Sequence, residues 1–85
     1  MATPTHLDGA RVFRTALGKF GVGYDDAAIV ALAIAQYEDN PSVTYVFACD
    51  RKWRVIGDLT YSSIDEAQRD AERYYEVSPI RWETA

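Results

Sequence analysis

The sequence has few of the side chains that catalysis and metal binding usually require. Its 85 residues include a single cysteine, Cys49, and a single histidine, His6. Cys49 has no partner for an internal disulfide, and a lone cysteine without an export signal indicates the cytoplasm. His6, the only side chain with an ordinary pKa near neutrality, lies in a segment, residues 1–7, that we expect to be disordered. From these shortages we predict that the protein is not an enzyme and has no cofactor or metal site.

Long apolar runs and a net positive charge are also missing. The longest uninterrupted apolar run, residues 27–35, is nine residues long, which is too short to cross a bilayer. The chain carries a formal net charge of -4, and this sign disfavours nucleic acids and anionic lipid surfaces as partners. We therefore expect no membrane association and no nucleic acid as the main ligand.

No segment has the pattern of a phosphate-binding loop. Residues 18–23 are rich in glycine, but they do not follow a predicted strand, and no Lys-Ser or Lys-Thr pair closes them. The acidic pairs Asp25-Asp26 and Asp65-Glu66 lie where we expect helices to begin, and the helix dipole explains carboxylates there. None of these patterns indicates a catalytic or metal site.

What the sequence does contain is enough apolar side chain for one small domain, residues 1–85. Hydrophobic residues make up 48% and aromatic residues 13%, which argues against disorder. A chain of this length buries only about 60–65% of the surface that it exposes when unfolded, so its core is thin. Small domains often compensate with disulfides, metals or oligomerisation. Because the sequence offers neither of the first two, we expect a homodimer.

The first half of the sequence predicts two helices. In residues 9–20 the apolar side chains recur at helical spacing, and the glycines that follow end the helix. In residues 25–39 the apolar side chains cover an arc of about 200°, which predicts a central helix that ends before Pro41. Alanines form the remaining side of this helix and make it smooth enough for close packing.

The second half predicts two strands joined by a tight turn, a helix and a last strand. The strands are residues 43–49 and 53–57, the helix is residues 63–76 with a capping box at its start, and the last strand is residues 80–83. A right-handed crossover makes the last strand parallel to the second. The predicted fold class is therefore α+β, in the order α-α-β-β-α-β, with a three-stranded mixed sheet of order 2-1-3 packed with helices.

The turn of the predicted hairpin, Arg51-Lys52-Trp53-Arg54, groups three cations and an indole. Such a tip could contact an acidic protein surface, with Trp53 and Arg54 as its anchors. It could also bind a phosphate or stack on a base. A third interpretation is a solvated turn in which Trp53 packs against the sheet.

Three segments share a pattern with one group of proteins. Trp53-Arg54-Val55-Ile56-Gly57 ends a hairpin, Tyr61-Ser62-Ser63-Ile64-Asp65-Glu66-Ala67 starts a helix, and Ile80-Arg81-Trp82-Glu83 forms a last strand. This combination, within residues 43–83, resembles small, mostly uncharacterised accessory proteins of phages, prophages and integron gene cassettes. The hairpin turn lacks the glycine of that pattern, and residues 1–41 show no resemblance. The resemblance implies a protein of a mobile genetic element and carries over no catalytic residue.

These patterns favour a cytoplasmic, non-catalytic binding module of a mobile element that acts by protein–protein contact. One alternative is a small-molecule-binding protein with its ligand between the helices and an aromatic sheet face. A second alternative is a weak nucleic-acid binder that uses the hairpin tip. The predicted partner-binding residues are Arg51, Lys52, Trp53 and Arg54. The candidate dimer interface combines the alanine side of the second helix with the aromatic sheet face: Ala28, Ala31, Ala35, Tyr45 and Trp82.

Overall fold

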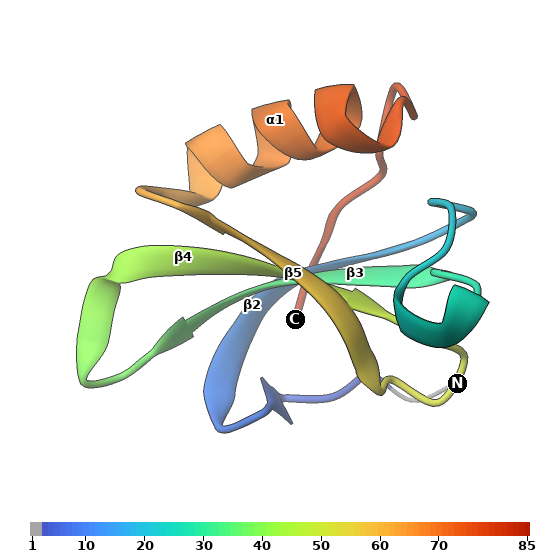
Figure 1. Ribbon diagram of the computed structural model, residues 1–85. Helices are drawn as coiled ribbons and strands as arrows, with labels where there is room; N and C mark the ends of the chain where they lie inside the picture. The colour runs from blue at the N-terminus through green and yellow to red at the C-terminus, as the bar shows by residue number, and fades with distance from the viewer. Residues whose placement is uncertain (1–2) are drawn as a thin grey trace.

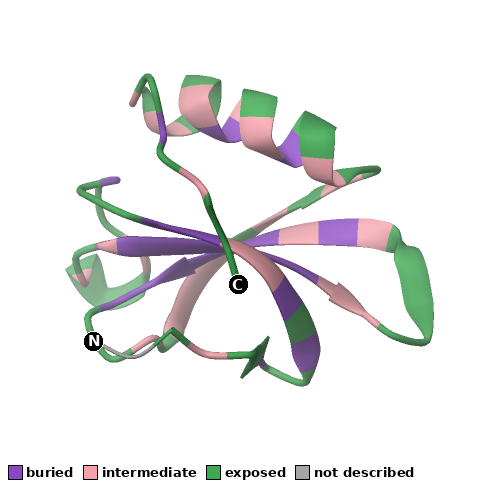
Figure 2. Ribbon diagram, turned by 180° about the vertical axis from the view of Figure 1, so that it is seen from behind, coloured by how far each residue is buried: buried purple, intermediate pink, exposed green. Residues whose placement is uncertain are grey.

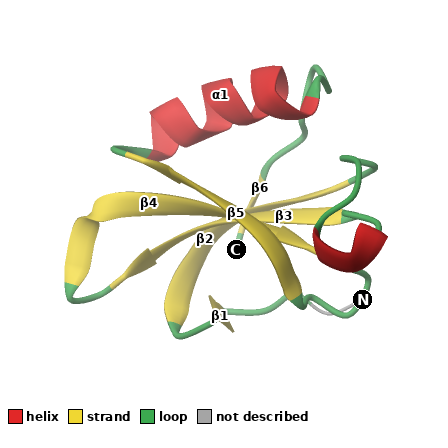
Figure 3. Cartoon of the chain, in the orientation of Figure 1, coloured by secondary structure: helices red, strands yellow, loops and turns green. Residues whose placement is uncertain are grey.

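A computed structural model describes residues 3–85, which form one curled antiparallel sheet with a helix on one side (Figure 1). Five strands are hydrogen-bonded in the order β1-β2-β3-β4-β5, and a sixth strand, β6, pairs with β2. The strands are β1 (His6–Leu7), β2 (Ala10–Leu17), β3 (Ala31–Tyr37), β4 (Asn40–Cys49), β5 (Val55–Tyr61) and β6 (Glu83–Thr84). The helix α1 spans Ile64–Tyr75, and a 3-10 turn, η1 (Tyr24–Asp26), lies in the long β2–β3 connection (Figure 3).

The predicted fold class is wrong. The protein is mostly β, with antiparallel strands that form a curled half-barrel, and not an α+β domain with a three-stranded mixed sheet. The predicted helices at residues 9–20 and 25–39 are replaced by β2 and β3. The predicted strand order 2-1-3 is also wrong, because β6 crosses to the far side of the sheet and pairs antiparallel with β2.

A bulge in β2 explains its misleading helical spacing. The register with β3 shifts between Val12 and Arg14. Before the shift, Ala10 and Val12 lie inside the curl, whereas Ala16, after the shift, packs on the side of α1. Because a bulge adds one residue to a strand, it moves the even-numbered positions from one face to the other. The apolar positions therefore do not alternate regularly along the sequence.

β3 was misassigned because it is buried on both faces (Figure 2). Leu32 and Ile34 face α1, and the three alanines of the strand face the inside of the curl. Periodicity alone does not separate such a strand from a buried helix, and alanine has the highest helix propensity. Here the alanines have another role, because short side chains let the strands curl tightly around the inner face.

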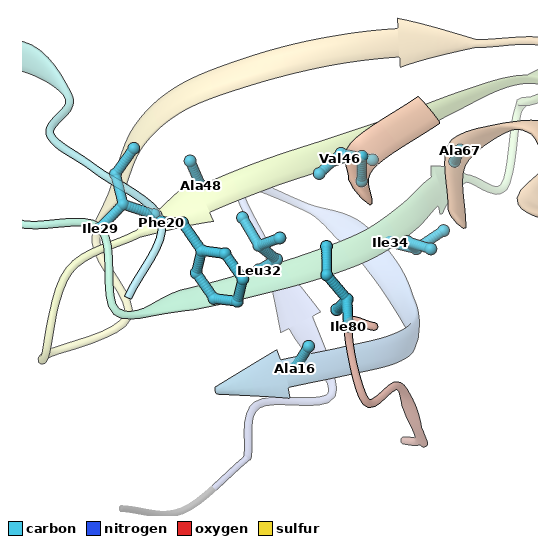
Figure 4. Packing of buried hydrophobic residues seen from close by; sticks show 10 residues of the cluster. Ala16, Phe20, Ile29, Leu32, Ile34, Val46, Ala48, Ala67 and Ile80 are labelled. Carbon is cyan, nitrogen blue, oxygen red and sulfur yellow. The ribbon is translucent and has the colours of Figure 1, made fainter. Parts of the chain in front are cut away.

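The core consists of two clusters, one on each side of the sheet. The helix-side cluster lies between the sheet and α1, where Leu32 and Ile34 meet Val46, Ala67 and Ile80 (Figure 4). The concave cluster fills the inside of the curl, and its buried members are Leu7, Ala10, Val12, Ala31, Ala33, Ala35, Phe47 and Cys49. A chain of this size therefore buries apolar side chains on both faces of one sheet.

The capped helix is confirmed. The Ser63 hydroxyl accepts a hydrogen bond from the Glu66 amide at 3.1 Å, as the capping box predicts. The Glu66 carboxylate accepts instead from the amide and hydroxyl of Ser62, one residue earlier than expected. Within residues 3–85, this helix and η1 are the only helical segments, and neither is long and apolar enough to cross a membrane.

In the described region, part of the N-terminal segment belongs to the sheet. His6–Leu7 pairs with β2, and Leu7 is buried in the concave cluster. The expectation of disorder for residues 1 and 2 lies outside the described residues.

Candidate functional site

A cleft of about 810 Å³ opens where three separate parts of the chain meet. Its walls come from the β2–β3 connection, from β5 and from the C-terminal end of α1, which converge at one end of the molecule (Figure 1). Phe20 and Tyr75 pack edge to face inside it, with ring centroids 5.9 Å apart. The cleft combines segments that are distant in sequence, since its lining residues run from Lys19 to Val77.

Exposed apolar side chains gather at this cleft. Four large hydrophobic side chains are exposed in the described part of the chain: Leu17, Val22, Tyr24 and Tyr74, with exposed fractions of 65%, 62%, 72% and 60%. All of them except Leu17 line the cleft. Clustered exposed apolar groups in a monomer mark interaction sites, whereas single ones are ordinary.

Two glycines shape the cleft. A Cβ atom on Gly23 would lie 2.3 Å from the carbonyl oxygen of Ile56, so the β2–β3 connection approaches β5 closely only because residue 23 has no side chain. Gly57 of β5 lies opposite Ala48 of β4, and a Cβ there would be 3.5 Å from the Ala48 methyl group. Gly23 thus lets the connection lie directly against Ile56, whereas the missing side chain of Gly57 leaves room beside the strand.

β5 has an open edge at the cleft. It pairs with β4 on one side, and it is the last strand in the order of the sheet. Within the described region, no backbone group outside β4 hydrogen-bonds to residues 57–60. Unpaired amide and carbonyl groups on an edge strand are a template for pairing with another extended chain.

A hydrogen-bond network joins β5 to α1 at the other end of the strand. The Tyr61 hydroxyl donates to Asp70 Oδ2 at 2.5 Å, and Arg73 also pairs with Asp70. The hydrogen bond from Tyr61, followed by that from Arg73, lowers the pKa of Asp70, and burial followed by the bond to Asp70 raises the pKa of Tyr61. In the cleft, burial raises the pKa of Tyr75 to about 12, so its phenol is neutral near pH 7.

The four predicted partner-binding residues of the hairpin tip lie in different environments. Arg51 and Lys52 are exposed, and Arg54 Nε donates to Asp50 Oδ2 at 2.8 Å. Trp53 packs beside the concave cluster, and its indole N–H is buried without a partner among residues 3–85. The indole therefore packs towards the sheet, as in the third interpretation of this turn, while Arg51 and Lys52 are exposed and Arg54 is exposed but paired with Asp50.

Asp50 organises this tip, although it was not among the predicted site residues. Its Oδ1 atom accepts hydrogen bonds from the amides of Lys52 and Arg54, both at 2.9 Å. An aspartate that begins a turn and bonds to amides two or more residues later is a known turn signature, so the signal was present in the sequence. The Arg54 amide is the main cause that lowers the pKa of Asp50.

Replacing Asp50 with asparagine should destabilise the protein in a pH-dependent way. Because the pKa of Asp50 is lower in the folded state than its ordinary unfolded value of about 3.9, its stabilising effect is complete above that value and disappears as the pH falls below it. Urea unfolding at pH 7 and at about pH 3 should show a difference between native and Asp50→Asn protein that shrinks in acid. Asp39→Asn, at an exposed position, is the control, and a difference that is constant with pH would contradict this role.

The predicted dimer residues do not form one surface. Ala31 and Ala35 are completely buried inside the curl, so the alanine side of a helix does not exist. Tyr45 stacks on Phe47 with centroids 5.4 Å apart, and Trp82 packs against the helix-side cluster. Ala28 is exposed and lies beside Arg51 and Lys52 in a hollow of about 270 Å³.

The structure also places the two reactive side chains that the sequence singled out, Cys49 and His6. Burial, followed by the charge of Asp50, raises the pKa of Cys49 to about 12, so this thiol is neutral near pH 7. His6 is exposed, and its ring contacts the neighbouring Thr5 hydroxyl at 3.1 Å. Among residues 3–85, no three His, Cys, Asp or Glu side chains are grouped so that they could hold a metal ion.

In comparisons with protein-family models, curated proteins and solved structures, nothing matched this chain. The geometry of the cleft and of the strand edge beside it is therefore the basis for a functional assignment.

Proposed function

We propose that this protein is a non-catalytic binding module that acts by contacting another protein, and that the partner docks at the cleft beside β5. The observation that supports this proposal best is that the open edge of β5 lies next to three exposed large apolar side chains, Val22, Tyr24 and Tyr74. An edge strand can accept an extended segment of a partner as an additional strand. Main-chain hydrogen bonds then give affinity, and neighbouring pockets give specificity.

Removing the exposed aromatic rings of the cleft should strongly reduce partner recovery. We expect Tyr24→Ser/Tyr74→Ser to reduce the amount of a partner recovered from host lysate by roughly tenfold or more, because exposed aromatic side chains are frequent binding hot spots. Affinity purification with native protein, followed by mass spectrometry, measures this. Leu17→Ser is the matched control, since Leu17 is equally exposed but does not line the cleft.

The same experiment separates the cleft from the hairpin tip. Arg51→Ala/Lys52→Ala removes the two exposed cations of the tip that are not in the ion pair with Asp50, and it should leave recovery unchanged. If partner recovery is lost with this variant and not with the tyrosine variant, the partner binds at the tip instead of the cleft. An acidic protein surface would then be the expected ligand. Recovery of no specific protein by the native chain would reject the proposal.

A small-molecule-binding protein is the second candidate function. The cleft volume of about 810 Å³ lies within the range of about 300–1,000 Å³ that is usual for ligand sites, and its walls are largely aromatic and aliphatic. A thermal-shift screen against metabolites and nucleotides distinguishes the two functions. Reproducible stabilisation by one compound class, lost in Tyr24→Ser/Tyr74→Ser, would favour this candidate.

Three further proposals accompany this function and rest on the sequence. The chain functions as a homodimer, because its thin core has no disulfide to supplement it. It works in the cytoplasm, and it belongs to a mobile genetic element. Sedimentation equilibrium tests the first of these, and the genomic neighbourhood tests the last.

A further inference from the structure

β5 presents different chemistry on its two faces. Leu59 lies opposite Val46 and packs on the helix side. Asp58 lies opposite Phe47, a member of the concave cluster, and is therefore on the other face of the strand. Successive residues of a strand point to opposite faces, so a segment added along this edge would alternate in the same way.

The helix-side face of this edge has room for apolar side chains. Gly57 contributes no side chain, and Ala48 behind it contributes only a methyl group. Phe20 and Tyr75 stand beside them as an interacting aromatic pair. Apolar side chains of an added strand would enter the cleft here and lose their contact with water.

The other face of the edge carries an unpaired negative charge. Asp58 is exposed, and within the described residues it forms no ion pair. Asp58 borders the cleft at the strand edge, where Glu76 is the second acidic residue and Lys19 the one cation. The edge therefore complements a basic side chain, and opposite charges that face each other across two strands stabilise the pair.

We infer that the β5 edge selects an extended segment of a partner protein with the pattern apolar–basic–apolar. The basic side chain, lysine or arginine, lies opposite Asp58, and its two apolar neighbours enter the cleft over Gly57 and Leu59. This inference rests on the proposed function and names the class of partner segment. The pattern is symmetrical, so it applies to either direction of the added strand.

A second copy of this chain fits the edge less well. An antiparallel pair of β5 strands centred on Asp58 would place two carboxylates directly opposite each other, and like charges in this position are destabilising. A charged residue in the middle of an edge strand is a common protection against self-pairing. Asp58 therefore discriminates between another β5 edge and a basic segment.

Synthetic peptides test the inference directly. The probe is a fluorescein-labelled peptide, Ser-Thr-Thr-Val-Lys-Phe-Thr-Thr-Ser, and fluorescence anisotropy with the full chain measures its affinity. Replacing its lysine with glutamate should weaken binding about fivefold or more, since a cross-strand attraction becomes a repulsion. Replacing its valine and phenylalanine with serine should weaken binding roughly tenfold or more. The lysine and phenylalanine amides of the peptide are consecutive, so only one of them can face the β5 edge. N-methylation of that amide should abolish binding, and N-methylation of the other should leave binding unchanged.

A charge exchange identifies the position of the basic residue. In Asp58→Lys, the glutamate peptide should bind better than the lysine peptide. Asp39→Lys is the matched control, because it changes the net charge equally at the β3–β4 turn, the opposite end of the molecule (Figure 1). This control should keep the preference for lysine.

Failure of this inference differs from failure of the proposed function. If none of the peptides binds, or if Asp58→Lys and Asp39→Lys change the preference equally, the inference is overturned. The proposed function still stands in that case if native protein recovers a partner that Tyr24→Ser/Tyr74→Ser does not.

Discussion

Leu32→Ala is expected to lower the free energy of unfolding by about 3 kcal/mol, within the 2–5 kcal/mol that is usual for large-to-small changes in a core. Leu32 is completely buried near the start of β3, where its side chain packs in the helix-side cluster (Figure 4). The truncation removes apolar contacts and leaves a cavity that β3, held between two strands, cannot close. Urea denaturation followed by circular dichroism measures the change.

The same truncation at an exposed position is the control for this prediction. Leu17→Ala removes the same atoms from a side chain that is 65% exposed, and it should change stability by less than about 0.5 kcal/mol. If Leu32→Ala does not fold, Ile34→Val provides a smaller change of about 1 kcal/mol at the next helix-side position. Equal effects at Leu32 and Leu17 would contradict the described core.

Ala33→Leu is expected to destabilise the protein by about 1–3 kcal/mol through overpacking. Ala33 is completely buried inside the curl, and it lies between Thr15 of β2 and Phe47 of β4 in the sheet register. A longer side chain must displace the concave cluster or open the curl. Thermal unfolding measures the loss of stability, and near-ultraviolet circular dichroism reports the displaced aromatic rings.

Ala28→Leu is the control for overpacking, because Ala28 is exposed. This substitution should change stability by less than about 0.5 kcal/mol. The two substitutions also distinguish the observed strand from the helix predicted for residues 25–39. In that helix, Ala28, Ala31 and Ala35 would share one smooth side. If Ala33→Leu changed stability as little as Ala28→Leu, this result would contradict the tight packing inside the curl.

The functional assignment depends on the same curvature. Curling the sheet brings β5 to an outer edge, and the helix that follows it returns over the helix-side cluster, so that its C-terminal end stands next to the β2–β3 connection. Gly23 allows that connection to reach β5. The cleft is therefore a consequence of topology, and the peptide and purification experiments test whether the protein uses it.

The sequence by itself determined the elements whose signals are local. The helix after β5 was predicted because Ser63 and Glu66 cap it through contacts only three residues apart. The strand at residues 43–49 was predicted because β-branched and aromatic side chains favour an extended chain. The turn before β5 was also recognisable, although the role of Asp50 in it was missed.

Only the tertiary structure decided the rest. The extended state of residues 31–37 depends on hydrogen bonds to β2 and β4 and on burial of both faces, which outweigh the helix propensity of its alanines. The pairing of β6 with β2 joins residues about 70 positions apart, and no local pattern encodes it. The orientation of Trp53, which decides whether the indole anchors a partner or packs beside the core, likewise follows from the curl around the concave cluster. Local propensities differ by less than about 1 kcal/mol per residue, so burial and long-range pairing determine the fold wherever the two disagree.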